Sequence, residues 1–129
     1  MRGIVNVKKI IVVDDEPDVL KTTSIFLKSE GFNVVTAVDG IAALEVIRKE
    51  RPDLIVLDIM LPKIDGYKIC RMLKFDDKFR DIPIIIFTAR AQEVDEKKAM
   101  EVKADAYITK PFQPDVLLGK IKQLLSMPR

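Results

Sequence analysis

The chain has 129 residues, of which 48% are hydrophobic, so it is long and apolar enough for one domain with a proper core. Its 22 basic and 20 acidic residues leave a net charge of +2, which gives no sign of nucleic-acid or membrane binding through bulk charge. Cys70 is the only cysteine, which excludes an intramolecular disulfide and a cysteine metal cluster. With neither a signal-peptide pattern nor a membrane-spanning stretch in the sequence, a cytoplasmic protein is expected.

The first part of the chain alternates predicted strands and helices. Residues 9–13 form a short apolar run that predicts a strand, and Glu16-Pro17-Asp18 suits the first turn of a helix that closes at Gly31. The inward face of that helix is expected to consist of Val19, Leu20, Thr23, Phe26 and Leu27. Residues 32–37 predict a second strand and Asp39-Gly40 a turn. A helix over 41–49 then stops before Pro52.

The middle of the chain holds the third predicted strand, over residues 53–58. Its apolar residues, Leu54 to Leu57, run without a polar break, which is typical of a strand buried on both faces in a parallel sheet. Asp65 is a plausible N-cap for a helix over 66–74, whose inward residues are predicted to be Ile69, Met72 and Leu73. Cys70, in the same helix, is expected to be a small packed side chain and not a redox switch.

Two further strand and helix pairs complete the pattern. Residues 82–87 and 106–108 predict strands, residues 90–102 predict a weakly amphipathic helix, and a final helix starts at Pro114. Each of the five units takes about 22–28 residues, the size of a right-handed crossover. The sequence therefore predicts one α/β domain over residues 1–129, with a doubly wound five-stranded parallel sheet and five helices.

Reactive side chains stand where four of these strands end. They are Asp14 and Asp15 after the first strand, Asp58 after the third, Thr88 after the fourth and Lys110 after the fifth. The carboxyl ends of parallel strands share one edge, where open α/β sheets bind ligands, so these residues are expected to converge. Taken singly, each has a simpler explanation, such as a helix cap, a core-edge hydroxyl or a solvated loop charge.

The chemistry of this set points to phosphoryl transfer. Three carboxylates within about 5 Å repel each other by roughly 3 kcal/mol per pair, so the site needs a cation. Oxygen ligands suit Mg²⁺ or Mn²⁺. A carboxylate beside such a cation and Lys110 is well placed to attack phosphorus and form an aspartyl-phosphate. The Thr88 hydroxyl is placed to donate to one of the phosphoryl oxygens.

Four motifs resemble the receiver domain of two-component response regulators over about residues 8–126. They are VVDDEP at 12–17, LDIMLPKIDG at 57–66, Thr88-Ala89 and YITKPF at 107–112. The resemblance implies a flavodoxin-like fold with strand order 2-1-3-4-5, like that of a chemotaxis regulator. The chain departs from the family at Lys103, where a glycine is usual. A positive φ there costs a residue other than glycine on the order of 1 kcal/mol.

By this resemblance, Asp58 accepts a phosphoryl group from the phosphohistidine of a sensor histidine kinase. Mg²⁺ is expected to be held by Asp14, Asp15, Asp58 and the backbone carbonyl of Met60. Thr88 and Tyr107 are implied to form a switch pair, with Lys110 neutralising charge at the site. The Lys110–Pro111 peptide is implied to be cis.

No effector domain is expected after the last helix, so the signal is expected to leave the domain through a protein-binding surface. Phosphorylation is predicted to draw Thr88 inward and to move Tyr107 from an outward to an inward position. A downstream protein or a second copy of the chain would then bind the face made by the fourth helix, fifth strand and fifth helix.

No nucleic-acid or membrane binding is expected of this domain, and no enzymatic activity beyond self-phosphorylation and slow autodephosphorylation. Both a complete single-domain regulator and the receiver of a longer protein remain open.

Two other functions compete with this one. A haloacid-dehalogenase-like phosphatase also forms an aspartyl-phosphate, but its nucleophile follows the first strand and it usually needs a longer chain. A flavodoxin-like flavin carrier is disfavoured because no Ser/Thr/Gly-rich phosphate loop follows the first strand.

Overall fold

A parallel sheet forms the centre of the protein in the computed structural model, which describes residues 7–88 and 103–127. Its strand order is β2-β1-β3-β4-β5, and every neighbouring pair is parallel, which confirms the predicted doubly wound, flavodoxin-like sheet. The strands are β1 (Lys9–Val13), β2 (Asn33–Ala37), β3 (Leu54–Asp58), β4 (Ile84–Thr88) and β5 (Ala106–Thr109).

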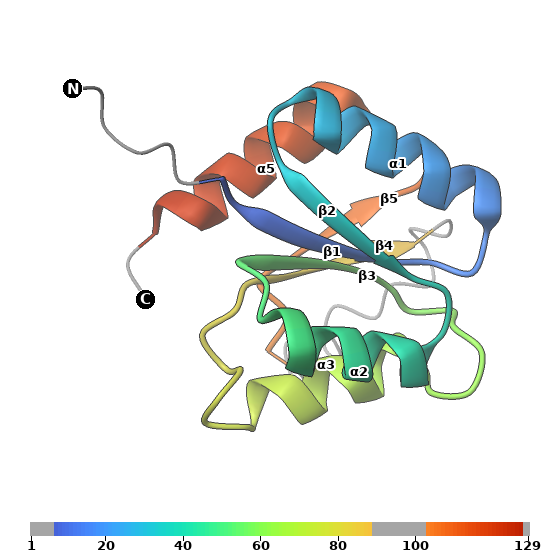
Figure 1. The fold of residues 1–129 in the computed structure, drawn as a ribbon, viewed down its shortest axis with the longest axis vertical. Helices are drawn as coiled ribbons and strands as arrows, with labels where there is room; N and C mark the ends of the chain where they lie inside the picture. The colour runs from blue at the N-terminus through green and yellow to red at the C-terminus, as the bar shows by residue number, and fades with distance from the viewer. Residues whose placement is uncertain (1–6, 89–102, 128–129) are drawn as a thin grey trace.

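Helices cover both faces of this sheet (Figure 1). In the described part of the chain, α1 (Pro17–Ser29) and α5 (Pro114–Ser126) lie on one face, while α2 (Gly40–Glu50) and α3 (Gly66–Lys74) lie on the other. The helix predicted over 90–102 lies outside the described residues. A sheet covered on both faces needs apolar side chains on both, which explains the unbroken apolar runs in the sequence.

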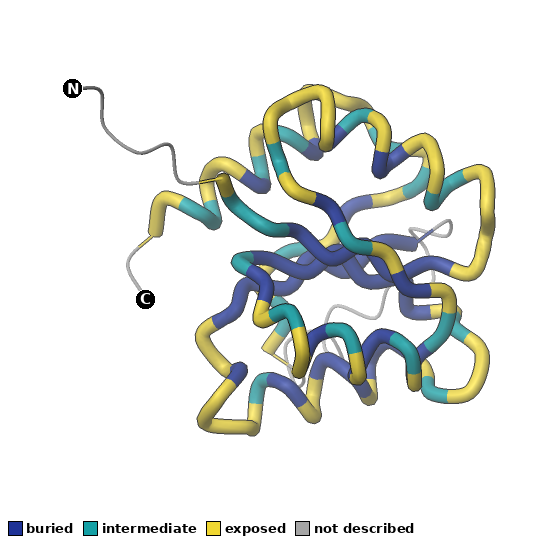
Figure 2. Tube along the Cα trace, in the orientation of Figure 1, coloured by how far each residue is buried: buried dark blue, intermediate teal, exposed yellow. Residues whose placement is uncertain are grey.

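Burial follows the position of each strand in the sheet (Figure 2). All residues of the inner strands β3 and β4 are buried. At the edge, β2 buries Val34 and Ala37 but exposes Asn33 and Thr36. Successive residues of β1 serve opposite cores: Ile10 joins the cluster under α1 and α5, and Ile11 joins the cluster under α2 and α3. This alternation is the period of two expected for a strand.

Aspartates begin the two helices on the α2–α3 side. Asp39 Oδ1 accepts from Ala42 N–H at 2.8 Å, and Asp65 Oδ1 accepts from Lys68 N–H at 3.0 Å. The Asp65 cap confirms the prediction. The predicted turn at Asp39-Gly40 leads directly into α2, which begins at Gly40, one residue earlier than predicted, with the Asp39 side chain as its cap.

The packing of α3 corrects one prediction and confirms another. Met72 was expected to face inward, but it is 41% exposed, while Ile69, Cys70 and Leu73 are buried. The inward stripe of α3 is centred on Cys70 and Leu73, and Met72, one residue before Leu73, is turned about 100° away from it. The packed role expected for Cys70 is confirmed.

Cys70 is expected to be chemically inert in the folded protein. Burial raises the pKa of its thiol to about 12, against an ordinary value of 9.0. This difference lowers the thiolate population about 1,000-fold at neutral pH, and the thiolate is the reactive form. A thiol reagent should therefore label the urea-unfolded chain quickly and the native chain at least 100-fold more slowly, about as fast as the chain opens. Fast native labelling would contradict this burial.

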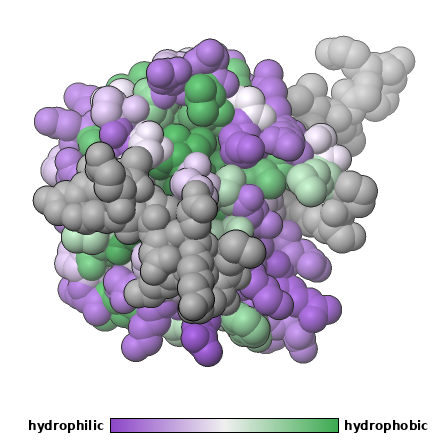
Figure 3. All heavy atoms as spheres, turned by 180° about the vertical axis from the view of Figure 1, so that it is seen from behind, coloured by the Kyte–Doolittle hydropathy of each residue, from purple (hydrophilic) through white to green (hydrophobic). Residues whose placement is uncertain are grey.

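Apolar and charged side chains are mixed on the surface. Seen from behind, a patch of hydrophobic side chains is surrounded by hydrophilic ones (Figure 3). Among the described residues, no helix is both long enough and apolar enough to cross a membrane.

Candidate phosphoryl-acceptor site

Four strand ends meet at one edge of the sheet and bring distant residues together. The register pairs Val13 with Leu57, and Asp58 with Phe87, so Asp14 and Asp58 leave neighbouring strands at a similar height. The last residues of β4 and β5, Thr88 and Thr109, are also paired. Lys110, which directly follows β5, reaches across to the same place as Asp14 and Asp58.

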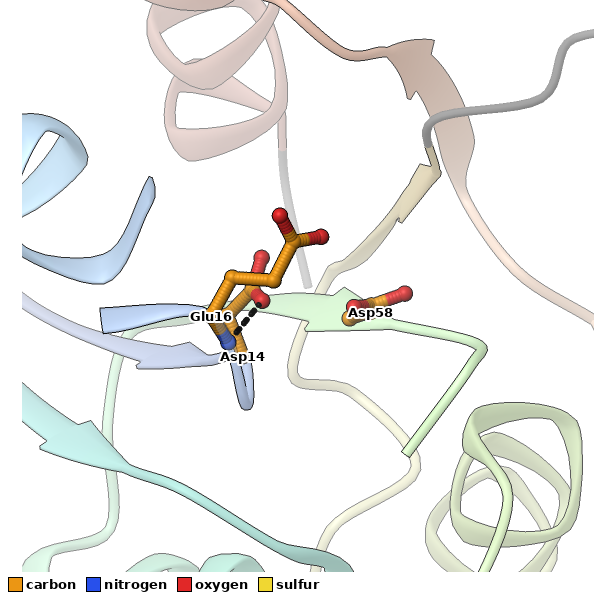
Figure 4. Close-up of side chains that lie close together, drawn as sticks. All are labelled: Asp14, Glu16 and Asp58. Atoms are coloured by element: carbon orange, nitrogen blue, oxygen red, sulfur yellow. Dashed lines mark hydrogen bonds between the residues drawn. The ribbon is translucent and has the colours of Figure 1, made fainter. Parts of the chain in front are cut away.

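A group of three carboxylates forms the centre of the site (Figure 4). Asp14, Glu16 and Asp58 each offer an oxygen within 4.8 Å of the others. Asp14 is fully buried and Asp58 is 2% exposed, whereas Glu16 is exposed. Asp15, which the sequence placed in this group, is exposed and lies outside it.

Glu16 is the member that the sequence analysis missed. It was assigned only to the start of the first helix, where it is indeed the N-terminal flanking residue of α1. Its backbone is extended, with φ −89° and ψ 113°. Alternate residues of an extended segment point the same way, which brings the Glu16 carboxylate to the side of Asp14. That alternation was a usable signal in the sequence.

Lys110 supplies the positive charge that balances these acids. Its Nζ lies 2.5 Å from Asp14 Oδ2, 3.0 Å from Asp58 Oδ2 and 3.3 Å from Glu16 Oε1. The ammonium is also 5.5 Å from the centre of the Phe87 ring, within range of a cation–π interaction. The Lys110 side chain is only 6% exposed, so most of its attraction to Asp14 and Asp58 is shielded from water.

Backbone amides fix the orientation of the two buried aspartates. Glu16 N–H donates to Asp14 Oδ1 at 2.9 Å, and Met60 N–H donates to Asp58 Oδ1 at 2.9 Å. In both cases the donor is two residues further along the chain, as in an Asx-turn. One oxygen of each carboxylate is thereby held by the backbone, and the other faces Lys110.

Burial and ion pairing act in opposite directions on the pKa values of this site. Desolvation raises the pKa of Asp14, and its contact with Lys110 offsets only part of that rise. Burial alone would lower the pKa of Lys110, but hydrogen bonds to Asp14 and Asp58 outweigh it, so the pKa is raised. Lys110 is therefore a permanent cation at neutral pH.

The acidic group has the chemistry of a site for a hard divalent cation. Asp14 Oδ2 is buried, faces the Lys110 ammonium at 2.5 Å and lies in a group with the Asp58 carboxylate. A buried carboxylate oxygen with unused lone pairs next to a second carboxylate suits Mg²⁺, which prefers oxygen ligands. The donor set therefore fits the expected metal.

The other predicted residues lie around this centre. Thr88 is buried at the end of β4, and Tyr107 in β5 is 42% exposed, the outward position expected before phosphorylation. Tyr107 and Val116 border a hollow of about 330 Å³, lined also by Ile108, Thr109, Pro111 and Gln113. This hollow lies beside β5 and α5, on the face that is expected to bind the downstream partner.

Two backbone features match the expectations. The Lys110–Pro111 peptide is cis, as the resemblance implied. Lys103 has a φ of 61°, so this departure from the usual glycine carries the expected cost of about 1 kcal/mol. Its Nζ lies 5.0 Å from the centre of the Phe75 ring, and this contact recovers part of that cost.

The fold and this edge of the sheet define a receiver. The family model of the response regulator receiver domain matches residues 10–122, and the chain belongs to this family of two-component signalling domains. No finding supports the phosphatase alternative.

Known relatives agree with this assignment. The alkaline phosphatase synthesis transcriptional regulatory protein PhoP of Bacillus subtilis is 42% identical over 118 residues, which cover 92% of this chain and 48% of PhoP. The receiver domain of the sensor histidine kinase PA1611 from Pseudomonas aeruginosa, with a magnesium ion in its active site cleft, is 29% identical with a TM-score of 0.87. That match covers 95% of this chain and 100% of the other.

A chemotaxis regulator is similar as well. CheY4 of Vibrio cholerae is 27% identical with a TM-score of 0.85, over 92% of this chain and 99% of that protein. The chain spans about half the length of the curated relatives it matches.

Proposed function

We propose that Asp58 is the residue that accepts the phosphoryl group in this receiver, and that the donor is the phosphohistidine of a sensor histidine kinase. The observation that carries this proposal is the setting of the Asp58 carboxylate. It is buried at the end of β3, with one oxygen held by Met60 N–H and the other 3.0 Å from the Lys110 ammonium. A fixed carboxylate next to a fixed cation is prepared to attack phosphorus.

In the transfer, an Asp58 oxygen forms the new bond to phosphorus. The phosphorus–nitrogen bond of the donor breaks, and the imidazole nitrogen keeps the electron pair. Lys110 offsets the negative charge on the phosphoryl oxygens, and the Thr88 hydroxyl donates a hydrogen bond to one of them. Asp58 is therefore a phosphoryl acceptor that is modified once per signal, with slow hydrolysis as its only further chemistry.

Asp14, Asp15, Asp58 and the backbone carbonyl of Met60 would hold the Mg²⁺, or Mn²⁺, on which this transfer depends. A bound divalent cation supplies positive charge for the transferring phosphoryl group. Asp15 is exposed and adjacent to Asp14, so its carboxylate can reach a cation from the solvent side. Glu16 is a further oxygen donor at the same place. The PA1611 receiver, which carries magnesium in its active site cleft, supports this assignment.

Signal output is proposed to use Thr88 and Tyr107. When Thr88 moves toward the phosphoryl group, Tyr107 turns inward from its present exposed position and reshapes the hollow beside β5 and α5. Coupling of this kind is typically worth about 1–3 kcal/mol. The partner is a downstream protein or a second copy of the chain. Direct nucleic-acid binding is not assigned to this domain, although PhoP is a transcriptional regulatory protein.

Treatment with acetyl phosphate and Mg²⁺ is expected to add one phosphoryl group per chain, and Asp58→Asn is expected to add none, because an amide is not a nucleophile. Intact-protein mass spectrometry measures both. Asp53→Asn is the matched control. Asp53 lies just before the other end of the same strand, where its Oδ2 accepts from Lys9 N–H at 2.8 Å, so this variant should label fully.

Equal labelling of Asp58→Asn would contradict the assignment. Continuous turnover of an aryl phosphate, in place of stoichiometric labelling, would instead favour a phosphatase.

A further inference from the structure

The loop between β3 and α3, residues 59–65, is held from outside by the turn that begins α2. Gly40 N–H donates to the Pro62 carbonyl oxygen at 3.4 Å, and Lys63 Nζ lies 3.4 Å from Asp39 Oδ2. Asp39 keeps its other oxygen on Ala42 N–H, so it caps α2 and pairs with the loop at the same time. These contacts join segments more than twenty residues apart in the chain.

The close approach requires a glycine at position 40. A Cβ there would lie 2.7 Å from the Ile64 carbonyl oxygen and 2.8 Å from Ile64 Cβ, closer than such atoms come in proteins. Gly40 is buried and its φ is not in the left-handed region, so the need is for space and not for conformational freedom. The loop rests directly on the backbone of α2.

The loop itself is strained at Lys63. The Pro62 carbonyl also accepts from Ile64 N–H at 2.9 Å, which closes a three-residue turn around Lys63 with φ 72°. A residue other than glycine is unfavourable in such a turn. Strained backbone of this kind persists only where surrounding contacts fix it, and Asp39 and Gly40 supply those contacts.

We propose that the Asp39–Gly40 turn is a positioning element for the phosphoryl-acceptor site, which holds the strained loop 59–65 so that Met60 stays against Asp58. Met60 N–H donates to Asp58 Oδ1 at one end of the loop, and Gly66 N–H donates to the Ile59 carbonyl oxygen, which closes it. The inference rests on the proposed function, since Met60 is there a metal ligand. Its consequence is that loop rigidity raises the affinity for Mg²⁺ by reducing the cost of ordering the ligands.

Lys63→Gly tests the inference because it should weaken Mg²⁺ binding without lowering the stability of the folded protein. Glycine relieves the positive φ at position 63, so the unfolding midpoint in urea should rise or stay the same. The loop becomes freer, so the Kd for Mg²⁺ should rise about tenfold, the size typical of outer-shell changes at metal sites. Removing a positive charge near the acids would by itself strengthen Mg²⁺ binding, so a weaker affinity cannot be a charge effect. The Mg²⁺ dependence of the unfolding midpoint gives the Kd.

Arg51→Gly is the matched control. Arg51 also carries a positive φ, 47°, but it ends α2 at the far end of the helix from Gly40. It should match Lys63→Gly in charge and in stability, yet leave the Kd for Mg²⁺ within twofold of the parent protein. A second variant, Gly40→Ala, should weaken Mg²⁺ binding as well as lower the unfolding midpoint.

A Kd in Lys63→Gly within twofold of the parent protein would overturn the positioning role. Loss of Mg²⁺ binding in the parent protein itself would instead overturn the proposed metal site. The two failures are therefore distinguishable.

Discussion

Replacing Lys110 by Met is expected to destabilise the metal-free protein by about 2–4 kcal/mol at pH 7, because it leaves buried carboxylates without their countercharge. Asp14 and Asp58 are almost completely inaccessible to water, and Lys110 Nζ contacts both. Urea denaturation in the absence of divalent ions measures the effect. Lys21→Met, at an exposed position of α1, is the control and should change stability by less than about 0.5 kcal/mol.

The stability of the folded protein is expected to depend on pH through the raised pKa values of Asp14 and Lys110. The pKa of Asp14 is already raised above its ordinary 3.8 by burial, so between pH 3.8 and that raised pKa the folded state holds a proton that the unfolded state has lost. Stability therefore falls as the pH rises from about 3.8 through the raised pKa, and without Lys110 that window should extend to higher pH. In the parent protein, the contribution from the raised pKa of Lys110 is fully present below pH 10.5 and is lost as the pH rises from 10.5 through that raised pKa.

Divalent cations should partly rescue the variant. Lys110 and Mg²⁺ would neutralise the same carboxylates, so the gain in stability on adding Mg²⁺ is expected to be larger in Lys110→Met than in the parent protein. A variant as stable as the parent without metal would show that Lys110 is not the countercharge of this site.

This balance explains how a stable fold can carry a site of clustered acids. Without a cation the carboxylates would repel, and a lysine from the far end of the chain provides the charge that allows β1 and β3 to end side by side. In the proposed function, the same lysine is then in place to offset the negative charge that a phosphoryl group would add to Asp58. A structural requirement of the fold and a requirement of the chemistry are met by one side chain.

Much of the site could be predicted because it depends on topology. Unbroken apolar runs identify buried parallel strands, and parallel strands bring their carboxyl ends to one edge. Asp14, Asp58, Thr88 and Lys110 were therefore placed near one another although they span almost the whole sequence. These predictions need only the order of the elements and not the details of packing.

The features that the sequence analysis missed depend on backbone and packing geometry, which the order of the strands and helices does not determine. Glu16 joins the acidic group because its extended backbone brings its carboxylate to the side of Asp14. Met72 was assigned to the core by its apolar character, but the inward stripe of α3 is set by Ile69, Cys70 and Leu73. Gly40 contacts the loop after β3, which is more than twenty residues away in the chain. The distance between these two segments depends on the folded backbone, so no local sequence pattern could predict the contact.

Gly66→Ala is expected to destabilise the protein by about 2–3 kcal/mol, the upper part of the range for overpacking, because the neighbouring atoms cannot move aside. A Cβ at this position would lie 2.4 Å from the Asp58 carbonyl oxygen and 2.5 Å from Ile59 Cα. Both are backbone atoms, so either α3 moves away from the sheet or β3 shifts at Asp58. Because the second response displaces the phosphoryl acceptor, labelling by acetyl phosphate should also slow, as measured by intact mass over time.

Gly119→Ala is the matched control for this prediction. Gly119 lies inside α5, and a Cβ there would have nothing within 4 Å. The same chemical change should therefore stabilise the protein by about 0.5–1 kcal/mol, because alanine favours the helix over the unfolded chain. Its labelling rate should match the parent protein. If both variants lost stability equally, the effect would belong to glycine replacement in general, and the close packing of α3 on the end of β3 would not be its cause.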